Sequence, residues 1–571
     1  MPPREALAAV PLRPADQVMR LARMGAAFQT RLSFMRQLLR RMSSEHWRFE
    51  RLRFDVDADG FGASVYAAHG PERSYSLVAF TRDIPPDERT DRVIAKVWDG
   101  TFSLFDGIPS DADIARLSEN TPRQEAGRFR ASELVLARGN KSLRLFEHVV
   151  ERLSHGEQPD AELLCDVGYL MRTTAVYGSG KFGCADRLKI AERPELAAPF
   201  QAEMLTVYLI RWLTIDLVNH VASCRGGEAA VALDADHARY LGIGNSTGLG
   251  MVPFLVKYPE LIHNWVAARE TALARVRAIT HASDDEIAGF LGLIARALRQ
   301  VGEWRVEDDT QIRRIDGLKV DLAALADWCG EGLKAPKPWD AAYLFAEDNF
   351  SPEGQEFTVS LLLEERGDLV DDLGPTMSAT SGFVLDPTMV LGDLKALIEE
   401  HYGWALGIDY DDPTAQERFW YYSEDKLEPR LGERFKEPGA EREMPLSVGR
   451  DAARLFAAVA ARDAAEPVAD FLIAHPEFRH MVRRVQGTAV APYGEIRDNL
   501  LAAGVRPLDV LRFKLAFFGV SKFDPKSDLW TRVNMFQGAP LPLELAAGWD
   551  GEWVFPVRPG GPSAIAGEGA S

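Results

Sequence analysis

The sequence is poor in cysteine: its 571 residues contain only Cys165, Cys184, Cys224 and Cys329. No two of them form a Cys-x-x-Cys pair, which excludes zinc-ribbon and thioredoxin-like signatures. Histidine gives no metal signature either, because His475 and His480 are five residues apart and do not share a helix face. We therefore expect no metal site, and we expect structural thiols in a reducing compartment.

Long apolar runs are also lacking. The first residues contain no apolar segment of the kind that a secretory signal requires. The most apolar run, residues 204–221, is close to the minimum length for a membrane span, but it contains Arg211 and Asp216, which are costly in hydrocarbon. The run therefore predicts a buried core helix and no membrane span, in a cytoplasmic protein.

Positive charge is in the minority. The chain has 66 Lys and Arg residues against 85 Asp and Glu residues, a net charge of −19, so most of its surface would repel a nucleic acid. The sequence also has no repeat of fixed period and no Gly-x-Ser-x-Gly nucleophile elbow of a hydrolase. Its 46% apolar and 26% charged residues are typical of globular proteins, and its length predicts two to four domains.

The residue patterns that are present predict an α+β protein that is predominantly helical, with an N-terminal antiparallel sheet on a helical core and a smaller mixed C-terminal part. Alternating apolar residues between short polar turns indicate the sheet. We place five parts along the chain: residues 1–45, an amphipathic N-terminal helix; 46–109, the antiparallel sheet region; 110–333, the helical core with two Gly-rich loops; 334–556, a mixed α/β region; and 557–571, a disordered tail.

Periodicity predicts helices and strands at particular positions. Residues 14–42 read as one arginine-rich helix, which we expect to dock on an acidic face of this chain or of a partner subunit. Residues 132–152 and 161–174 read as helices, and residues 356–364 read as a strand. Ser110 and Asp113 have the spacing of a helix capping box.

The first Gly-rich stretch runs from Arg172 to Gly183 and places Lys181 between glycines. It resembles a phosphate-binding loop, but Phe182 stands where a Ser or Thr must hold Mg²⁺, which disfavours a nucleoside-triphosphate site. We predict instead a site for a small anion, with Lys181 or Tyr177 transferring a proton and with Arg172 and Ser179 binding substrate. The alternative is a glycine-rich turn in which Lys181 pairs with a nearby acid.

The second Gly-rich stretch runs from Gly242 to Gly250. Its spacing is similar to a dinucleotide fingerprint, but no buried apolar strand precedes it. We predict a loop that ends at a helix N-terminus, where Asn245 and Thr247 bind an anion and Ser246 takes part in catalysis. The alternative is simple capping, with glycines that allow close helix packing.

Two pairs of arginines complete the predicted site. Arg123 and Arg128 flank a glutamate, and Arg430 and Arg434 have helical spacing. Guanidinium groups can grip a carboxylate or a phosphate with two hydrogen bonds, so we include these four residues among the substrate-binding candidates. The alternative is that both pairs belong to charged surface segments.

These patterns predict a soluble metabolic enzyme that acts on a small anionic metabolite, a carboxylate or a phosphorylated compound, by acid–base chemistry of the lyase type. The sequence does not identify a cofactor. A flavin- or nicotinamide-dependent oxidoreductase is the first alternative, with the same loops holding the pyrophosphate. A non-catalytic interaction protein that self-associates through its arginine-rich first helix is the second, and we expect a homo-oligomer.

Overall fold

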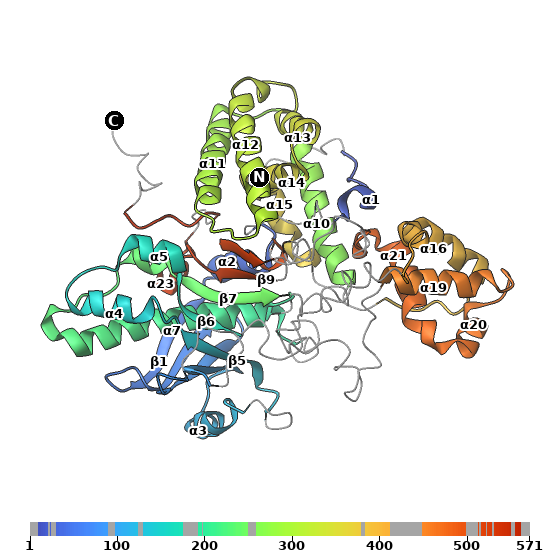
Figure 1. Ribbon diagram of the computed structural model, residues 1–571. Coiled ribbons are helices and arrows are strands. Elements are labelled where there is room, and N and C mark those ends of the chain that lie inside the picture. The colour runs from blue at the N-terminus through green and yellow to red at the C-terminus, as the bar shows by residue number, and fades with distance from the viewer. Residues whose placement is uncertain are drawn as a thin grey trace.

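The computed structural model describes most of the chain. The described residues are 10–20, 23, 30–88, 97–123, 129–174, 192–196, 198–248, 259–377, 383–411, 448–497, 512, 516–520, 522–527, 530–549 and 554–560. They confirm an α+β architecture that is mostly helical (Figure 1).

The described strands form one nine-stranded sheet with the order β1-β2-β3-β4-β5-β6-β7-β9-β8. Strands β1 to β6 follow one another as an antiparallel meander, β6 and β7 are parallel, and β9 and β8 continue the sheet in antiparallel fashion. The end of the chain therefore completes a sheet that the first half begins. The strands are β1 (Arg48–Val56), β2 (Gly62–His69), β3 (Ser74–Thr81), β4 (Gly100–Asp106), β5 (Glu133–Lys141), β6 (Tyr169–Thr173), β7 (Gly242–Gly248), β8 (Lys522–Ser527) and β9 (Trp530–Met535).

Two helices cover opposite faces of this sheet. The apolar run at residues 204–221 lies within α7 (Gln201–Gly226), which is buried along most of its length and contacts strands β2 to β7, as predicted. On the other face, α3 (Asp111–Asn120) packs Ile114 and Leu117 into a small separate apolar cluster. The predicted capping box of Ser110 and Asp113 begins α3.

The helical part packs beside the sheet and beyond it (Figure 1). One group consists of α10 (Pro259–Arg277), α11 (Asp284–Gly302), α12 (Asp309–Gly332), α13 (Pro338–Asn349), α14 (Pro352–Glu365), α15 (Gly367–Val370) and η6 (Asp371–Met377). A second group, α16 (Leu391–Leu406), α19 (Val448–Ala460), α20 (Val468–Ala474) and α21 (Arg479–Val490), stands apart from the sheet. Shorter elements are α4 (Phe146–Ser154), α5 (Ala161–Val167), η3 (Pro194–Leu196), η4 (Gly227–Ala229), α8 (Ala235–Tyr240), η8 (Pro476–Phe478), η9 (Pro492–Gly494) and α23 (Pro542–Ala546). None of the helices in the described ranges has both the length and the apolar character needed to cross a bilayer.

The arginine-rich N-terminal segment forms two helices, α1 (Ala15–Val18) and α2 (Phe34–Ser44), where we predicted one. Its arginines do dock on an acidic face of the chain itself. Arg36 binds Glu364 of α14, and Arg31 binds both Glu364 and Asp371. The intrachain form of the docking prediction is therefore confirmed.

Three further predicted elements are wrong. Residues 132–152 are strand β5 followed by α4, and residues 161–174 are α5 followed by β6. Gly168 ends α5, because it adopts φ +75° and its N–H caps the helix through the Leu164 carbonyl. Residues 356–364 lie in helix α14, not in a strand. Its continuous apolar run is buried on all sides between neighbouring helices, where a helix needs no polar stripe.

Candidate functional site

Strands β6 and β7 bring together the ends of two segments that the sequence singles out. The strands are parallel neighbours, with Tyr169 opposite Gly242 and Arg172 opposite Gly244. Helix α7 lies in the connection between them and packs against both. The chain therefore leaves β6 after Thr173 and leaves β7 after Gly248 at the same end of the sheet. Tyr177, Ser179 and Lys181, which follow β6, are outside the described residues.

The second Gly-rich stretch is not a loop that ends at a helix N-terminus. Its residues form strand β7, and the next described helix begins at Pro259. The glycines allow close packing between strands. A Cβ on Gly244 would come within 2.6 Å of the Tyr169 ring, and one on Gly242 within 2.5 Å of the Met535 carbonyl oxygen. The prediction that these residues cap a helix is therefore wrong. The alternative, that the glycines allow close packing, holds, but the elements that pack are strands and not helices.

The polar residues of β7 have a different environment from the predicted one. Asn245 is 2% exposed, and its Oδ1 has no hydrogen-bond partner among the described residues. Ser246 and Thr247 belong to the same strand, paired with Arg532 and Thr531 of β9, but their side chains are outside the described part. A buried carbonyl oxygen without a donor is costly, so Asn245 marks a position for which the described residues supply no donor.

The strand register places two arginines on one face of the sheet. Arg138 of β5 lies opposite Thr101 of β4, and Asn140 lies opposite Arg172 of β6. Side chains two residues apart on a strand share a face, so Arg138 and Arg172 are diagonal neighbours. Their face is the one turned away from α7, since the intervening rows of Phe102, Ala137 and Met171 belong to the core that packs on α7.

Arg138 carries a poorly compensated charge. Its Nη2 donates to the Pro122 carbonyl at 2.7 Å, its guanidinium lies 5.6 Å from the Trp98 ring centroid, and its Nε is buried without a partner among the described residues. Burial lowers the pKa of Arg138, and the nearby charge of Arg82 lowers this pKa further. Within the described ranges, no carboxylate pairs with Arg138 or Arg82. An anion at this face would therefore be stabilised.

Asp99 fixes the neighbouring strand ends. Its carboxylate accepts the Lys141 backbone N–H at 3.0 Å, and its own N–H donates to the Asn140 side chain at 3.0 Å. Asp99 is 4% exposed and the buried Arg172 is 8% exposed. These contacts hold the end of β5 against the start of β4, so the row that carries Asn140 and Arg172 is rigid. Rigid strands position binding groups more precisely than loops do.

The remaining arginine candidates are only partly described. Arg123 is exposed at the end of α3, next to Pro122, whose carbonyl binds Arg138. It therefore borders the same face of the sheet. Arg128, Arg430 and Arg434 lie outside the described residues. Sequence reasoning missed Arg138 and Asn140 because residues 132–152 resemble a helix and because residues 133–141 show no alternation of apolar and polar side chains that would signal a strand.

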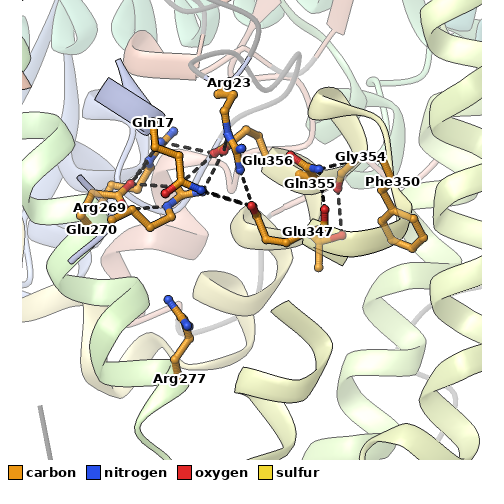
Figure 2. Close-up of polar contacts among 12 residues, drawn as sticks. Gln17, Arg23, Arg269, Glu270, Arg277, Glu347, Phe350, Gly354, Gln355 and Glu356 are labelled. Carbon is orange, nitrogen blue, oxygen red and sulfur yellow. Dashed lines mark hydrogen bonds and ion pairs between the residues drawn. The ribbon is translucent and has the colours of Figure 1, made fainter. Parts of the chain in front are cut away.

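A second set of charges, also missed, forms a closed ionic network in the helical layer (Figure 2). Arg13 donates to Glu270 at 2.8 Å and to Glu356 at 2.9 Å. Arg23 binds Glu347 and also lies 3.3 Å from Glu356. The network is completed by Arg269, which lies 3.2 Å from Glu270 and 3.3 Å from Glu356.

Electrostatics show that this network, which we call the closed cluster, is balanced. Its described members are Arg13, Arg23, Arg269, Glu270, Glu347 and Glu356. Burial alone would raise the pKa of Glu356, but the charges of Arg13 and Arg269 outweigh burial and lower it. Burial likewise opposes the charge on Arg13, yet Glu356 and Glu270 raise its pKa well above the usual value. Three arginines match three glutamates, so the closed cluster anchors the N-terminal segment and leaves no charge for a ligand.

The sequence does contain a signal for this anchoring. Glu353, Glu356 and Glu364 follow one another at intervals of three and eight residues, which places them on one face of α14. Each of them binds an arginine from a distant segment, Glu353 through Arg512. Buried carboxylates at helical spacing therefore predict an arginine-bearing partner segment.

Comparisons of the chain with protein-family profiles, with curated proteins and with solved structures found no match. Within the described ranges, no group of three His, Cys, Asp or Glu side chains has the arrangement that could hold a metal ion. The local geometry and charge where β6 and β7 end, and of the sheet face that carries Arg138 and Arg172, are therefore the basis for inferring a function.

Proposed function

We propose that the protein is an enzyme for a small anionic substrate, a carboxylate or a phosphorylated compound, and that it uses acid–base chemistry of the lyase type where β6 and β7 end. The parallel pairing of these strands carries the proposal, because the Lys181 segment and the segment after Gly248 then start side by side. Ligands of α/β sheets commonly bind beyond the carboxyl ends of parallel strands.

The face that carries Arg138 and Arg172 supports the anionic character of the substrate. Arg138 lacks a carboxylate partner among the described residues, and Arg82 adds a second positive charge nearby. In this proposal Arg138 and Arg172 bind the anion, and Lys181 or Tyr177, in the segment directly after β6, transfers the proton. Such a positioned proton donor or acceptor contributes about 10²- to 10⁴-fold in rate.

Binding can be tested before the substrate is identified. Fumarate and inorganic phosphate serve as probes in calorimetric titrations of the full chain, and we expect Arg138→Gln to weaken binding at least about tenfold, the loss of one charge-assisted contact. Lys319→Gln, on the exposed side of α12, is the control, with unchanged affinity. Wild-type affinity for both probes in the Arg138→Gln variant would overturn the anion-binding role of this face.

Turnover tests the acid–base role. With a panel of carboxylates and phosphorylated metabolites, we expect Lys181→Met to keep the wild-type circular dichroism spectrum and to lose at least about 100-fold in kcat. Unchanged kcat in Lys181→Met and in Tyr177→Phe would remove both residues as proton carriers. A visible absorbance band in the purified protein would point instead to flavin chemistry at the same edge.

A further inference from the structure

A cavity of about 1,040 Å³ opens beside α2 and shares no lining residue with the sheet face described above. It lies between α2, η3, η6 and the segment that follows α23. Ligand cavities usually measure about 300–1,000 Å³, so it is large enough for a small organic molecule. Its charged lining comes from the N-terminal segment, from the end of α14 and from η6, and consists of Arg31, Arg36, Arg40, Arg41, Glu45, His46, Glu364, Glu365 and Asp371.

One wall of this cavity contains an arginine cluster that is not balanced. Arg31 clamps Asp371 with two hydrogen bonds of 2.7 Å. Arg36 binds Glu364, which is almost completely buried, through a contact of 2.6 Å and a second hydrogen bond. These four residues pair off as two arginines with two carboxylates. Arg40 is a third arginine in the same wall, and we call the five residues the open cluster.

Arg40 is the surplus charge of the open cluster. Its Nη2 donates to the Arg31 carbonyl at 2.6 Å, while its Nε lies 3.3 Å from an Asp371 oxygen that already binds Arg31. Its Nη1 is buried without a hydrogen-bond partner among the described residues. Burial lowers the pKa of Arg40 to about 9; Asp371 partly opposes this decrease, and the charges of Arg36 and Arg31 add to it. The guanidinium therefore remains protonated at neutral pH, and the carboxylate nearest to it, Asp371, is shared with Arg31.

The other charged residues of the lining have their own partners. Arg41 donates to the carbonyl oxygens of Pro194 and Glu195 at 3.0 and 2.8 Å. Glu45 accepts from the Trp47 ring N–H at 2.8 Å and lies 3.6 Å from Arg41. Glu365 belongs to the same lining, and it contributes to the raised pKa of Arg366 after Asp368 and Glu286, which pair with Arg366 directly. Among the described ion pairs of this lining, Arg40 therefore has no carboxylate of its own, and its side chain is 26% exposed.

The cavity also has an apolar side. Leu39 and the half-buried Trp549 line it together with Pro375. Ser43 donates its hydroxyl to the backbone carbonyl of Trp549 at 2.6 Å, which ties the backbone at Trp549 to the end of α2. An aromatic ring and arginines in one cavity suit a ligand that has both a flat apolar part and a negative charge.

We propose that this cavity binds a small organic anion, with its phosphate or carboxylate beside Arg40 and its apolar part against Leu39 and Trp549. The anion supplies the negative charge that the open cluster lacks. This cavity shares no residue with the substrate site proposed where β6 and β7 end, so the two sites can be tested independently.

Phenyl phosphate, inorganic phosphate and benzyl alcohol separate the two parts of the proposed ligand. In calorimetric titrations of the full chain we expect phenyl phosphate to bind tightest, inorganic phosphate more weakly, and benzyl alcohol not measurably. Arg40→Gln weakens phenyl phosphate at least about tenfold, and Arg40→Lys restores part of the affinity. Trp549→Ala weakens phenyl phosphate but leaves inorganic phosphate unchanged.

Two comparisons make the test decisive. If phenyl phosphate still binds to Arg138→Gln but no longer binds to Arg40→Gln, its site is the cavity. The reverse pattern places the phenyl phosphate site on the sheet face that carries Arg138 and overturns the proposal. Absence of saturable binding to the folded wild-type protein also overturns it. If Arg40→Gln loses its wild-type circular dichroism spectrum, Trp549→Ala decides, because equal affinity for phenyl phosphate in that variant contradicts the cavity site.

Discussion

The closed and open clusters both consist of arginines paired with carboxylates, but they differ in the ratio of arginines to carboxylates. In the closed cluster, Arg13 is 3% exposed and its carboxylate partners raise its pKa well above the usual value. In the open cluster, Arg40 is 26% exposed and its surroundings lower its pKa to about 9. Both arginines come from the N-terminal segment and face glutamates or aspartates of the helical layer. The number of carboxylates around an arginine therefore decides whether the arginine is fully paired within the fold or can still bind an anionic ligand.

Removing Arg13 breaks the closed cluster and has the largest expected effect. In Arg13→Met, Glu270 and Glu356 stay buried with fewer partners, which we expect to reduce the free energy of unfolding by about 3 kcal/mol. Urea unfolding followed by circular dichroism measures this loss. Lys319→Met removes an exposed ion pair and serves as the control, with a change below about 1 kcal/mol. A loss in Arg13→Met no larger than in the control would contradict the anchoring role.

Lowering the pH protonates the carboxylates of both clusters. Each protonated carboxylate should reduce the free energy of unfolding by less than the removal of Arg13 does. The pKa values of Glu356 and Glu364 are lowered because neighbouring arginines outweigh burial. A glutamate in the unfolded chain has a pKa of about 4.3, so the stability that each of the two glutamates adds is complete above that pH. It is lost as the pH falls through the lower folded pKa. Urea unfolding between pH 7 and pH 3 should show this decrease, with a shallower slope in Glu356→Gln; an equal slope would contradict it.

Removing Arg40 should have the smallest effect on stability. Arg40→Met leaves two arginines with two carboxylates, so the open cluster becomes balanced and the free energy of unfolding should change by less than about 1 kcal/mol. The same urea experiment compares this variant directly with Arg13→Met. A loss as large as that of Arg13→Met would show that Arg40 is an anchor and not a surplus charge.

Local sequence signals predicted those elements whose stability is decided locally. Alternation and short turns identified the strands from β1 to β4, and apolar composition identified α7 as buried. The misassigned elements depend on distant partners. Strand β7 is rich in glycine and pairs with β9, which comes far later in the chain, so its own residues show little strand propensity. In α14, the buried glutamates gain their arginines only through tertiary packing.

The residues of the candidate site also divide into those that local sequence signals reveal and those that only the fold reveals. Arg172 could be selected from the sequence because it stands beside the Gly-rich stretch with Lys181. Arg138 could not, because only the register of β5 and β6 reveals that it shares a face with Arg172. The parallel pairing of β6 with β7 likewise needs the whole fold, since α7 and other residues separate the two strands.

The N-terminal anchor also sets an order of assembly. The partners of Arg13 lie 257 residues later at Glu270, 343 residues later at Glu356 and 480 residues later at Tyr493. Contacts between such distant residues form slowly, because a long stretch of chain must be ordered before they can be made. During synthesis, the positively charged first segment emerges from the ribosome long before its carboxylate partners do. The segment that contains Arg13 can therefore reach its final place only after these much later residues have been made.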